Sequence, residues 1–416
     1  MMRLPSRRRH AKAKQLGAAL MIMIVILVMG IVAALIGALS LSALQSARQG
    51  KTSAALAQAN AALIGYAASN SNMPGSLPCP DLLTNTPGTN VPNDGKSDDF
   101  SGNSCPSYVG RLPWHTLGLP ELLDGNGERL WYALSPNFRG DNSAQPLNSN
   151  TKGTLLVYGP DGVTLQTEAG YDAVAIIFSP GSAFGSQTRN TATEQNSAAN
   201  YLDTANSRNN ASSAGPFIAG AISTTFNDQL LFITSKDLMP LVEKRVAGVV
   251  KKAITGYFTA NGYYPWADSV AASANYASDI GQNRGWLPDN ATTSNSPYST
   301  LDWPLDSRPP DWFFANKWYS LIYYSAAKIH TVNSASCTSC IEDTLIVEDG
   351  TNNYEARVLF FMPGTYSGSR AIDNLSHYLE DTQNKDHAND IYVRPTSQAQ
   401  DRDRLYWLSS SSIWNQ

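Results

Sequence analysis

Residues 15–44 read QLGAALMIMIVILVMGIVAALIGALSLSAL and carry no charged side chain. A basic segment precedes this stretch, and the next charged residue after it is Arg48. A helix from Ala18 to Leu44 would contain 27 residues. It would be about 40 Å long, more than the roughly 30 Å of a bilayer's hydrocarbon core. We therefore expect a transmembrane helix over residues 18–44.

The positive charges before this stretch predict the direction of crossing. They are Arg3, Arg7, Arg8, Arg9, Lys12 and Lys14. Because they all precede the apolar residues, the positive-inside rule places the N-terminus in the cytoplasm and the remaining chain outside it. A cleaved secretory signal ending near Ser42 and Ala43 is an alternative. Its apolar region, however, would span only about 7–15 residues.

The helix is expected to continue beyond the apolar stretch. Residues 45–66 are rich in alanine and contain no proline, a composition that favours helix. The sequence therefore predicts one helix of about 45–50 residues, apolar in its first half and amphipathic in its second.

The residues around Gly17 resemble the type IV pilin and pseudopilin family. The run Lys14-Gln15-Leu16-Gly17 is similar to the end of a prepilin leader, and residues 18–22 are similar to the start of a mature pilin. The resemblance implies a leader over residues 1–17, cleavage after Gly17 by a prepilin peptidase, and methylation of Ala18. It also implies that Ala18 and position 22 act in assembly. Major pilins have a glutamate at this fifth mature position, whereas this chain has Ile22.

That departure favours a minor pilin or a pseudopilin-like subunit of a type IV pilus or type II secretion-like filament, at a tip or priming position. The implied partners are other pilin or pseudopilin subunits, the prepilin peptidase and an inner-membrane assembly platform. The implied location is the bacterial inner membrane, with a single pass and a periplasmic body, or a filament built from it. The alternative is a membrane-anchored periplasmic binding or adhesion protein that does not polymerise.

The chain after the long helix contains an internal repeat. Seven sequence blocks recur in the same order, with an offset of 191 residues between Gly65 and Gly256 and of 177 between Tyr201 and Tyr378. In this alignment Trp131 corresponds to Trp318. We therefore expect a first pilin-like domain over residues 45–235 and a second over residues 236–416.

Each domain is expected to begin with a helix and to continue with short strands. Residues 236–257 repeat apolar side chains every three or four positions, as one buried helical face does. Runs of aromatic and β-branched residues between Gly, Pro, Asn and Asp predict strands. The predicted fold class is α+β: a long N-terminal transmembrane and spine helix followed by two tandem domains, each a helix on an antiparallel sheet.

The four cysteines occur as two local pairs, Cys79 with Cys105 and Cys337 with Cys340. In an oxidising compartment each pair predicts a disulfide, although four cysteines allow three pairings. A disulfide that closes the loop between Cys79 and Cys105 would stabilise the folded protein by about 3 kcal/mol. The spacing of Cys337 and Cys340 also occurs in redox motifs and zinc sites, so these alternatives stay open.

One acidic loop has the chemistry of a weak calcium site. Asp94, Asp98 and Asp99 lie within a turn-forming segment, and Ca²⁺ prefers such oxygen ligands. The spacing does not match an EF-hand, and a solvated acidic loop is the alternative. Apart from this calcium the sequence predicts no cofactor.

Composition and motifs argue against catalysis and nucleic-acid binding. The chain contains five histidines and none of the common hydrolase or phosphate-binding motifs. Its formal net charge is −4 although the leader is basic, so the body is acidic. We therefore expect neither an enzyme nor a nucleic-acid binding protein.

Overall fold

The computed structural model describes residues 15–81, 93–98, 104–140, 146–270, 281–289, 303–331, 337–386, 389–395 and 403–416. Within the first helix, the side chains of residues 15–22, 25–26 and 30–41 lie outside this description.

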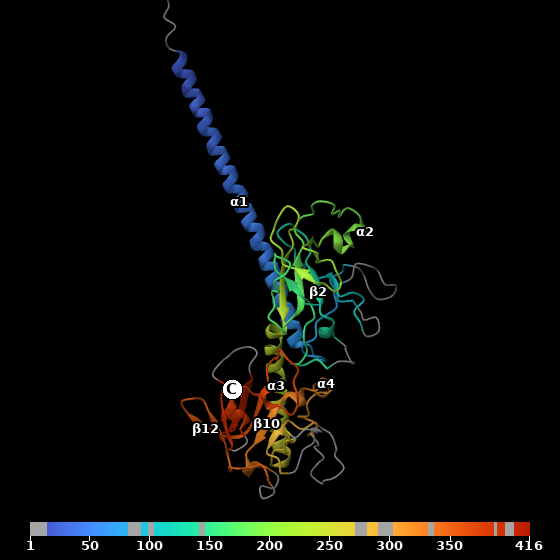
Figure 1. Cartoon of the computed structure of the whole chain (residues 1–416), viewed down its shortest axis with the longest axis vertical. Helices are drawn as coiled ribbons and strands as arrows, with labels where there is room; N and C mark the ends of the chain where they lie inside the picture. The colour runs from blue at the N-terminus through green and yellow to red at the C-terminus, as the bar shows by residue number, and fades with distance from the viewer. Residues whose placement is uncertain are drawn as a thin grey trace, which may run out of the picture.

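Helix α1 (Gln15–Ser69) is 55 residues long, and its N-terminal half projects from the body of the molecule (Figure 1). Its C-terminal half is buried along one face. Ala55, Ala59, Leu63 and Ala67 recur every four residues and are 0–7% exposed, so they form one stripe along the helix. Small side chains at three of these positions let the helix lie close to the sheet beneath it.

The first sheet is antiparallel, with the order β1-β2-β4-β8. Its strands are β1 (Val109–Arg111), β2 (Trp131–Leu134), β4 (Ala173–Ser179) and β8 (Gln229–Thr234). Side chains alternate between its two faces. Tyr132 and Ile177 pack in the core with α1, while Trp131 and Phe178 pack in a second core on the opposite face. Burial on both faces explains why residues 173–178 of β4 are all apolar.

Helix α3 (Ser235–Asn261) follows β8 without a loop. The backbone N–H of Thr234 donates to the carboxylate of Asp237 at 2.8 Å, which satisfies one of the amides at the helix start. The helix ends at Gly262, whose φ of 80° suits a glycine C-cap.

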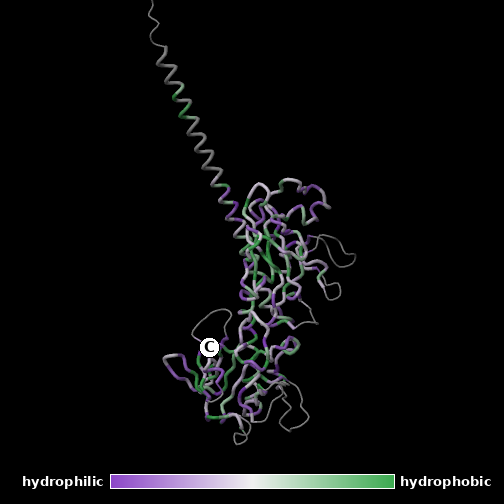
Figure 2. The backbone as a smooth tube through the Cα atoms, viewed as in Figure 1, coloured by the Kyte–Doolittle hydropathy of each residue, from purple (hydrophilic) through white to green (hydrophobic). Residues whose placement is uncertain are grey.

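The second sheet contains the strands that follow α3. They are β9 (Arg284–Trp286), β10 (Tyr323–Ala326), β11 (Leu345–Glu348), β12 (Asn353–Met362), β13 (Ile391–Val393), β14 (Arg404–Ser409) and β15 (Trp414–Asn415). The central strand β12 pairs with β10 and β11 on one side and with β14 on the other, and β15 pairs with β14. Figure 2 shows that apolar residues concentrate in the two sheets and polar residues in the loops.

The remaining strands and helices are shorter. They are β3 (Val157–Tyr158), β5 (Thr204–Ala205), β6 (Arg208–Asn209), β7 (Phe217–Ile218), α2 (Ala192–Gln195), α4 (Asp311–Ala315) and α5 (Thr382–Lys385). Short 3-10 helices cover residues 136–138, 198–200, 318–321, 328–330 and 375–377.

The two sheets share a strand arrangement. We define unit 1 as α1 with β1, β2, β4 and β8, and unit 2 as α3 with β9, β10, β12 and β14. The Tyr132 hydroxyl donates to the Pro78 carbonyl at 3.3 Å in unit 1, and the Tyr324 hydroxyl donates to the Pro265 carbonyl at 3.1 Å in unit 2. The structural counterpart of Trp131 is therefore Tyr323. The alignment of Trp131 with Trp318 was wrong, because Trp318 lies in a 3-10 helix before β10.

The predicted fold class was wrong. The structure is mixed α/β, with strands in several sheets, and two pairs are parallel: β11 with β13 and β3 with β7. The physical reason is that alternation in a sequence marks a strand but not the direction of the strand that pairs with it. The division into domains at residues 235 and 236 stays a prediction.

The predicted transmembrane span and the single-pass inner-membrane location are also contradicted. Among the described residues, no helix has the length and apolar character needed to cross a membrane. Polar and charged side chains follow from Gln45 onward.

Candidate functional site

The most prominent candidate for function is the projecting half of α1. Every side chain from residue 42 to residue 50 is exposed, whereas Thr52 is 2% exposed, so the helix meets the body at this point. Large apolar side chains are exposed on the projecting half. They are Met23, Ile24, Leu27, Val28, Met29 and Leu44. Clustered apolar side chains of this kind mark association surfaces.

The body holds α1 at the point where the helix meets it. The N–H of Gly125 donates to the Thr52 hydroxyl at 2.9 Å. Gly125 lies so close to the helix that a Cβ there would be 2.2 Å from the Arg48 carbonyl oxygen.

A second attachment lies at the C-terminal end of α1. The Arg245 guanidinium of α3 donates to the carbonyls of Ala68 at 3.0 Å and Asn70 at 2.6 Å. Cationic groups suit this position, because the last carbonyls of a helix carry partial negative charge. The two attachments fix the direction in which the N-terminal half projects.

The residues predicted to act in processing and assembly lie at the far end of the projecting helix. Gly17, Ala18 and Ile22 have helical backbone in the first turns of α1, and their side chains lie outside the described ones. Figure 1 places this end of the helix far from both sheets. The structure therefore does not bring these residues close to the cysteines or to the acidic loop.

Both predicted cysteine pairs form disulfides. Cys79 and Cys105, with Cα atoms 5.6 Å apart, are buried in the unit 1 core. Cys337 and Cys340 close a tight turn, also with a Cα separation of 5.6 Å. Within the described parts of the chain, no three His, Cys, Asp or Glu side chains gather where they could hold a metal ion.

The described part of the acidic loop, residues 93–98, folds onto Asp81, and the calcium site stays a prediction. The Asp81 carboxylate accepts the N–H groups of Asn93 at 3.0 Å and Gly95 at 2.8 Å. Asp94 faces Lys96 at 3.5 Å, Asp98 is buried, and Asp99 lies outside the described residues. Burial, with smaller contributions from Asp98 and Asp94, raises the pKa of Asp81 to about 7. Sequence reasoning missed this role of Asp81.

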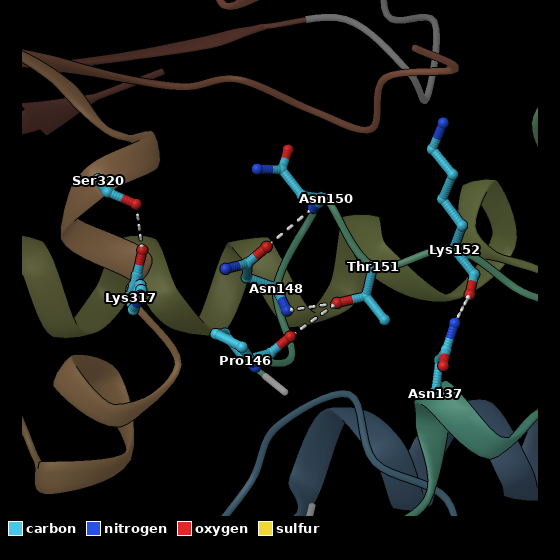
Figure 3. Close-up of a pocket in the computed structure, with 8 residues that line it drawn as sticks. All are labelled: Asn137, Pro146, Asn148, Asn150, Thr151, Lys152, Lys317 and Ser320. Carbon is cyan, nitrogen blue, oxygen red and sulfur yellow. Dashed lines mark hydrogen bonds between the residues drawn. The ribbon is translucent and has the colours of Figure 1, made fainter. Parts of the chain in front are cut away.

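A polar cavity of about 440 Å³ lies where the segment 146–152 meets unit 2. Figure 3 shows its lining, which consists of Asn137, Pro146, Asn148, Asn150, Thr151, Lys152, Lys317 and Ser320. Most of the polar groups bond to one another: the N–H of Asn148 donates to the Thr151 hydroxyl at 3.0 Å, and the Asn137 amide donates to the Lys152 carbonyl at 3.0 Å. Among the described residues no carboxylate or imidazole lines this cavity, and its ionisable side chains are Lys152 and Lys317.

A buried carboxylate, Glu243, links α3 to β14 within unit 2 and also to the segment 146–152 beside this cavity. Glu243 of α3 is 0% exposed and accepts hydrogen bonds from the Ser149 hydroxyl and from the Arg404 guanidinium of β14. Burial raises the pKa of Glu243, and Arg404 partly offsets that effect. Asn316 strengthens the same junction by accepting the N–H of Leu147 at 2.8 Å. In the sequence Glu243 looks like an ordinary helix-surface charge, so no local signal would have found it.

Comparison with protein families, curated proteins and solved structures found no match.

Proposed function

We propose that this protein is a structural subunit of a filament, similar to a minor pilin or pseudopilin, and that it assembles through the projecting half of α1. The observation that supports this proposal is the division of α1 into two parts. The second half is packed in the body, while the first half presents exposed Met, Leu and Val side chains and projects away from both sheets (Figure 1). Such a helix can pack against the equivalent helices of neighbouring subunits.

The position of unit 2 supports a tip or priming role. Unit 2 lies at the end of the molecule opposite the projecting helix, beyond unit 1 (Figure 1). In a filament whose core is built from α1 helices, unit 2 would lie beyond unit 1, at the end of the subunit farthest from that core. Ile22, in place of the glutamate of major pilins, supports a minor rather than a repeating subunit.

Mass spectrometry of the mature protein tests the processing step. The expected N-terminus is methylated Ala18, produced by cleavage after Gly17. A Gly17→Leu variant is expected to retain its leader, because a bulky side chain at the cleavage point blocks the peptidase. A mature chain that begins at any other residue would contradict the proposal.

A charge on the projecting helix tests the assembly step. Leu27 is 64% exposed on α1, and Val163 is 77% exposed on the body, which makes it a matched control. We expect Leu27→Glu to reduce incorporation into sheared filaments at least tenfold, since it places a charge in the helix-packing surface. Val163→Glu should change incorporation less than twofold. Equal incorporation of both variants would exclude α1 as the assembly surface.

A further inference from the structure

Strand β8 forms an open edge of the first sheet. The sheet order is β1-β2-β4-β8, and within the described parts of the chain β8 pairs only with β4. The other edge of this sheet is covered, because β1 forms a bridge between Arg111 and Asp81. An open edge presents unpaired N–H and C=O groups that can bond to another strand.

Strand β14 occupies the same position in unit 2, but there the edge is covered. The two strands are similar in sequence, QLLFIT in β8 and RLYWLS in β14. After β14 the chain turns back and adds β15, which places Trp414 opposite Leu408. The Trp414 ring lies 5.6 Å from the Phe360 ring, and its N–H donates to the Thr255 hydroxyl at 3.2 Å. After β8 the chain enters α3 at once, so no return strand can form.

The side chains of β14, whose edge is covered, are more deeply buried than those of β8. The four apolar residues 405–408 of β14 are 2–5% exposed. In β8 only Ile233 is fully buried, whereas Leu231 is 37% exposed and Leu230 and Phe232 are partly exposed. Because side chains alternate along a strand, Leu231 lies on one face of the sheet and the other two lie on the opposite face. A strand added beside β8 would cover all three.

Nothing in β8 opposes such pairing. The strand contains no proline and no charged residue from Gln229 to Thr234, although edge strands commonly carry lysine or proline to prevent association. The nearest basic residue, Lys236, is held at 2.7 Å by Glu168. A neutral strand can lie antiparallel to its own copy without bringing like charges together.

We propose that β8 pairs with β8 of a second copy of this chain, so that the two first sheets join into one antiparallel sheet across a twofold axis. The second copy is the occupant that fits, because a twofold axis makes the same edge self-complementary. Antiparallel pairing of identical strands satisfies the open N–H and C=O groups of both copies at once. This pairing uses a different surface from α1 and does not depend on the filament role.

The test measures the mass and the amide protection of the full chain in a non-ionic detergent, which suppresses association through the apolar side chains of α1. Sedimentation velocity at protein concentrations from about 1 µM to about 100 µM, the affinity range of modest interfaces, should show a dimer. Hydrogen exchange of β8 amides should slow at least tenfold as the dimer forms. Exchange in α3 should stay unchanged.

Two variants identify the surface. Leu231→Lys places like charges near one another in the paired strands and should weaken the dimer at least tenfold. Leu241→Lys alters an exposed leucine on α3, 48% exposed against 37% for Leu231, and should leave the dimer within twofold of the unchanged protein. Circular dichroism verifies that both variants are folded.

Three results would overturn the proposal. A monomer across the whole concentration range would exclude pairing with a second copy. A dimer that Leu231→Lys leaves intact would assign association to another surface. Protection of β8 that arises only when a different protein is added would assign the edge to that partner.

Discussion

Two aspartates are buried at equivalent positions of the two units, Asp228 before β8 and Asp403 before β14, and both have raised pKa values. Burial is the main cause for each. The Asp203 carboxylate raises the pKa of Asp228 further, and Glu380 does the same for Asp403. The pKa of Asp403 is about 7. The backbone N–H groups of Glu380 and Asp403 act in the opposite direction and lower it, but burial outweighs them.

The raised pKa of Asp403 predicts how the stability of the protein depends on pH. A folded-state pKa above the unfolded value means that the contribution to stability is complete below about pH 4 and is lost as the pH rises through about 7. Asp403→Asn should therefore raise the free energy of unfolding at pH 8 by a few kcal/mol and flatten its pH dependence between pH 4 and 7. Urea denaturation across this pH range measures the effect.

Asp161 is the matched control for this experiment. Hydrogen bonds from the hydroxyl and the N–H of Thr164 lower its pKa to about 2, and it lies on the surface. Its contribution is present above about pH 4 and is lost only as the pH falls toward 2. Asp161→Asn should leave the slope between pH 4 and 7 unchanged. If Asp403→Asn did likewise, Asp403 would not be protonated in the folded protein near neutral pH.

At the scale of elements, the loop that contains Gly125 makes one of the two attachments that fix the direction of α1. Replacing Gly125 by alanine places a methyl group against the backbone of Arg48, and backbone cannot move aside as a flexible side chain can. We expect Gly125→Ala to lower the free energy of unfolding by about 1–3 kcal/mol. Hydrogen exchange of residues 48–56 should rise as the helix lifts from the body.

Gly248 provides the control for the alanine substitution. It lies inside α3, and nothing lies within 4 Å of where its Cβ would be. Gly248→Ala should therefore raise the free energy of unfolding by about 0.5–1 kcal/mol, because alanine restricts the unfolded chain and favours helix. If both substitutions stabilised the protein, the α1 contact would not be the tight one described.

The helices could be predicted from the sequence, whereas the pairing of the strands could not. The long helix and α3 were expected because their composition and apolar spacing repeat over many turns. The parallel pairing of β11 with β13 was not expected, since the strand that pairs with a given strand depends on the path of the chain between them. For the same reason the register of Trp131 was misassigned: sequence similarity aligned it with Trp318, but hydrogen-bond partners align it with Tyr323.

At the scale of the whole molecule, one buried core runs through both units. Glu243 pairs with Arg404 within unit 2 and also accepts a hydrogen bond from Ser149, in the segment before β3. Removing one member of a buried ion pair leaves the other charge unpaired, which costs about 3–5 kcal/mol. We expect Glu243→Leu to lower the melting temperature, because the Arg404 guanidinium loses its partner and the hydrogen bond to Ser149 is lost.

Two further variants distinguish the ion pair from general damage. The double variant Glu243→Leu with Arg404→Leu should recover much of the lost stability, since no unpaired charge remains. Glu168→Gln, which removes a surface pair with Lys236, should cost at most about 1 kcal/mol. An unshifted transition in Glu243→Leu would show that the ion pair does not contribute to stability.

The sequence by itself determined the features that are local along the chain. The continuous helix through residues 15–69 follows from composition, and both disulfides join cysteines that are near one another in the sequence, 26 and 3 residues apart. Neighbouring residues meet whatever the rest of the fold does, so their interactions can be predicted from spacing.

Only the tertiary structure decided which groups are buried and which edges stay open. Glu243 and Arg404 are 161 residues apart, and the raised pKa of Asp403 and the open edge of β8 depend on equally distant segments. The burial of a charge and the covering of a strand depend on the whole surrounding structure. No pattern in the local sequence predicts this surrounding structure. For this reason β14 and β8 can be similar in sequence while the edge of β14 is covered and the edge of β8 is open.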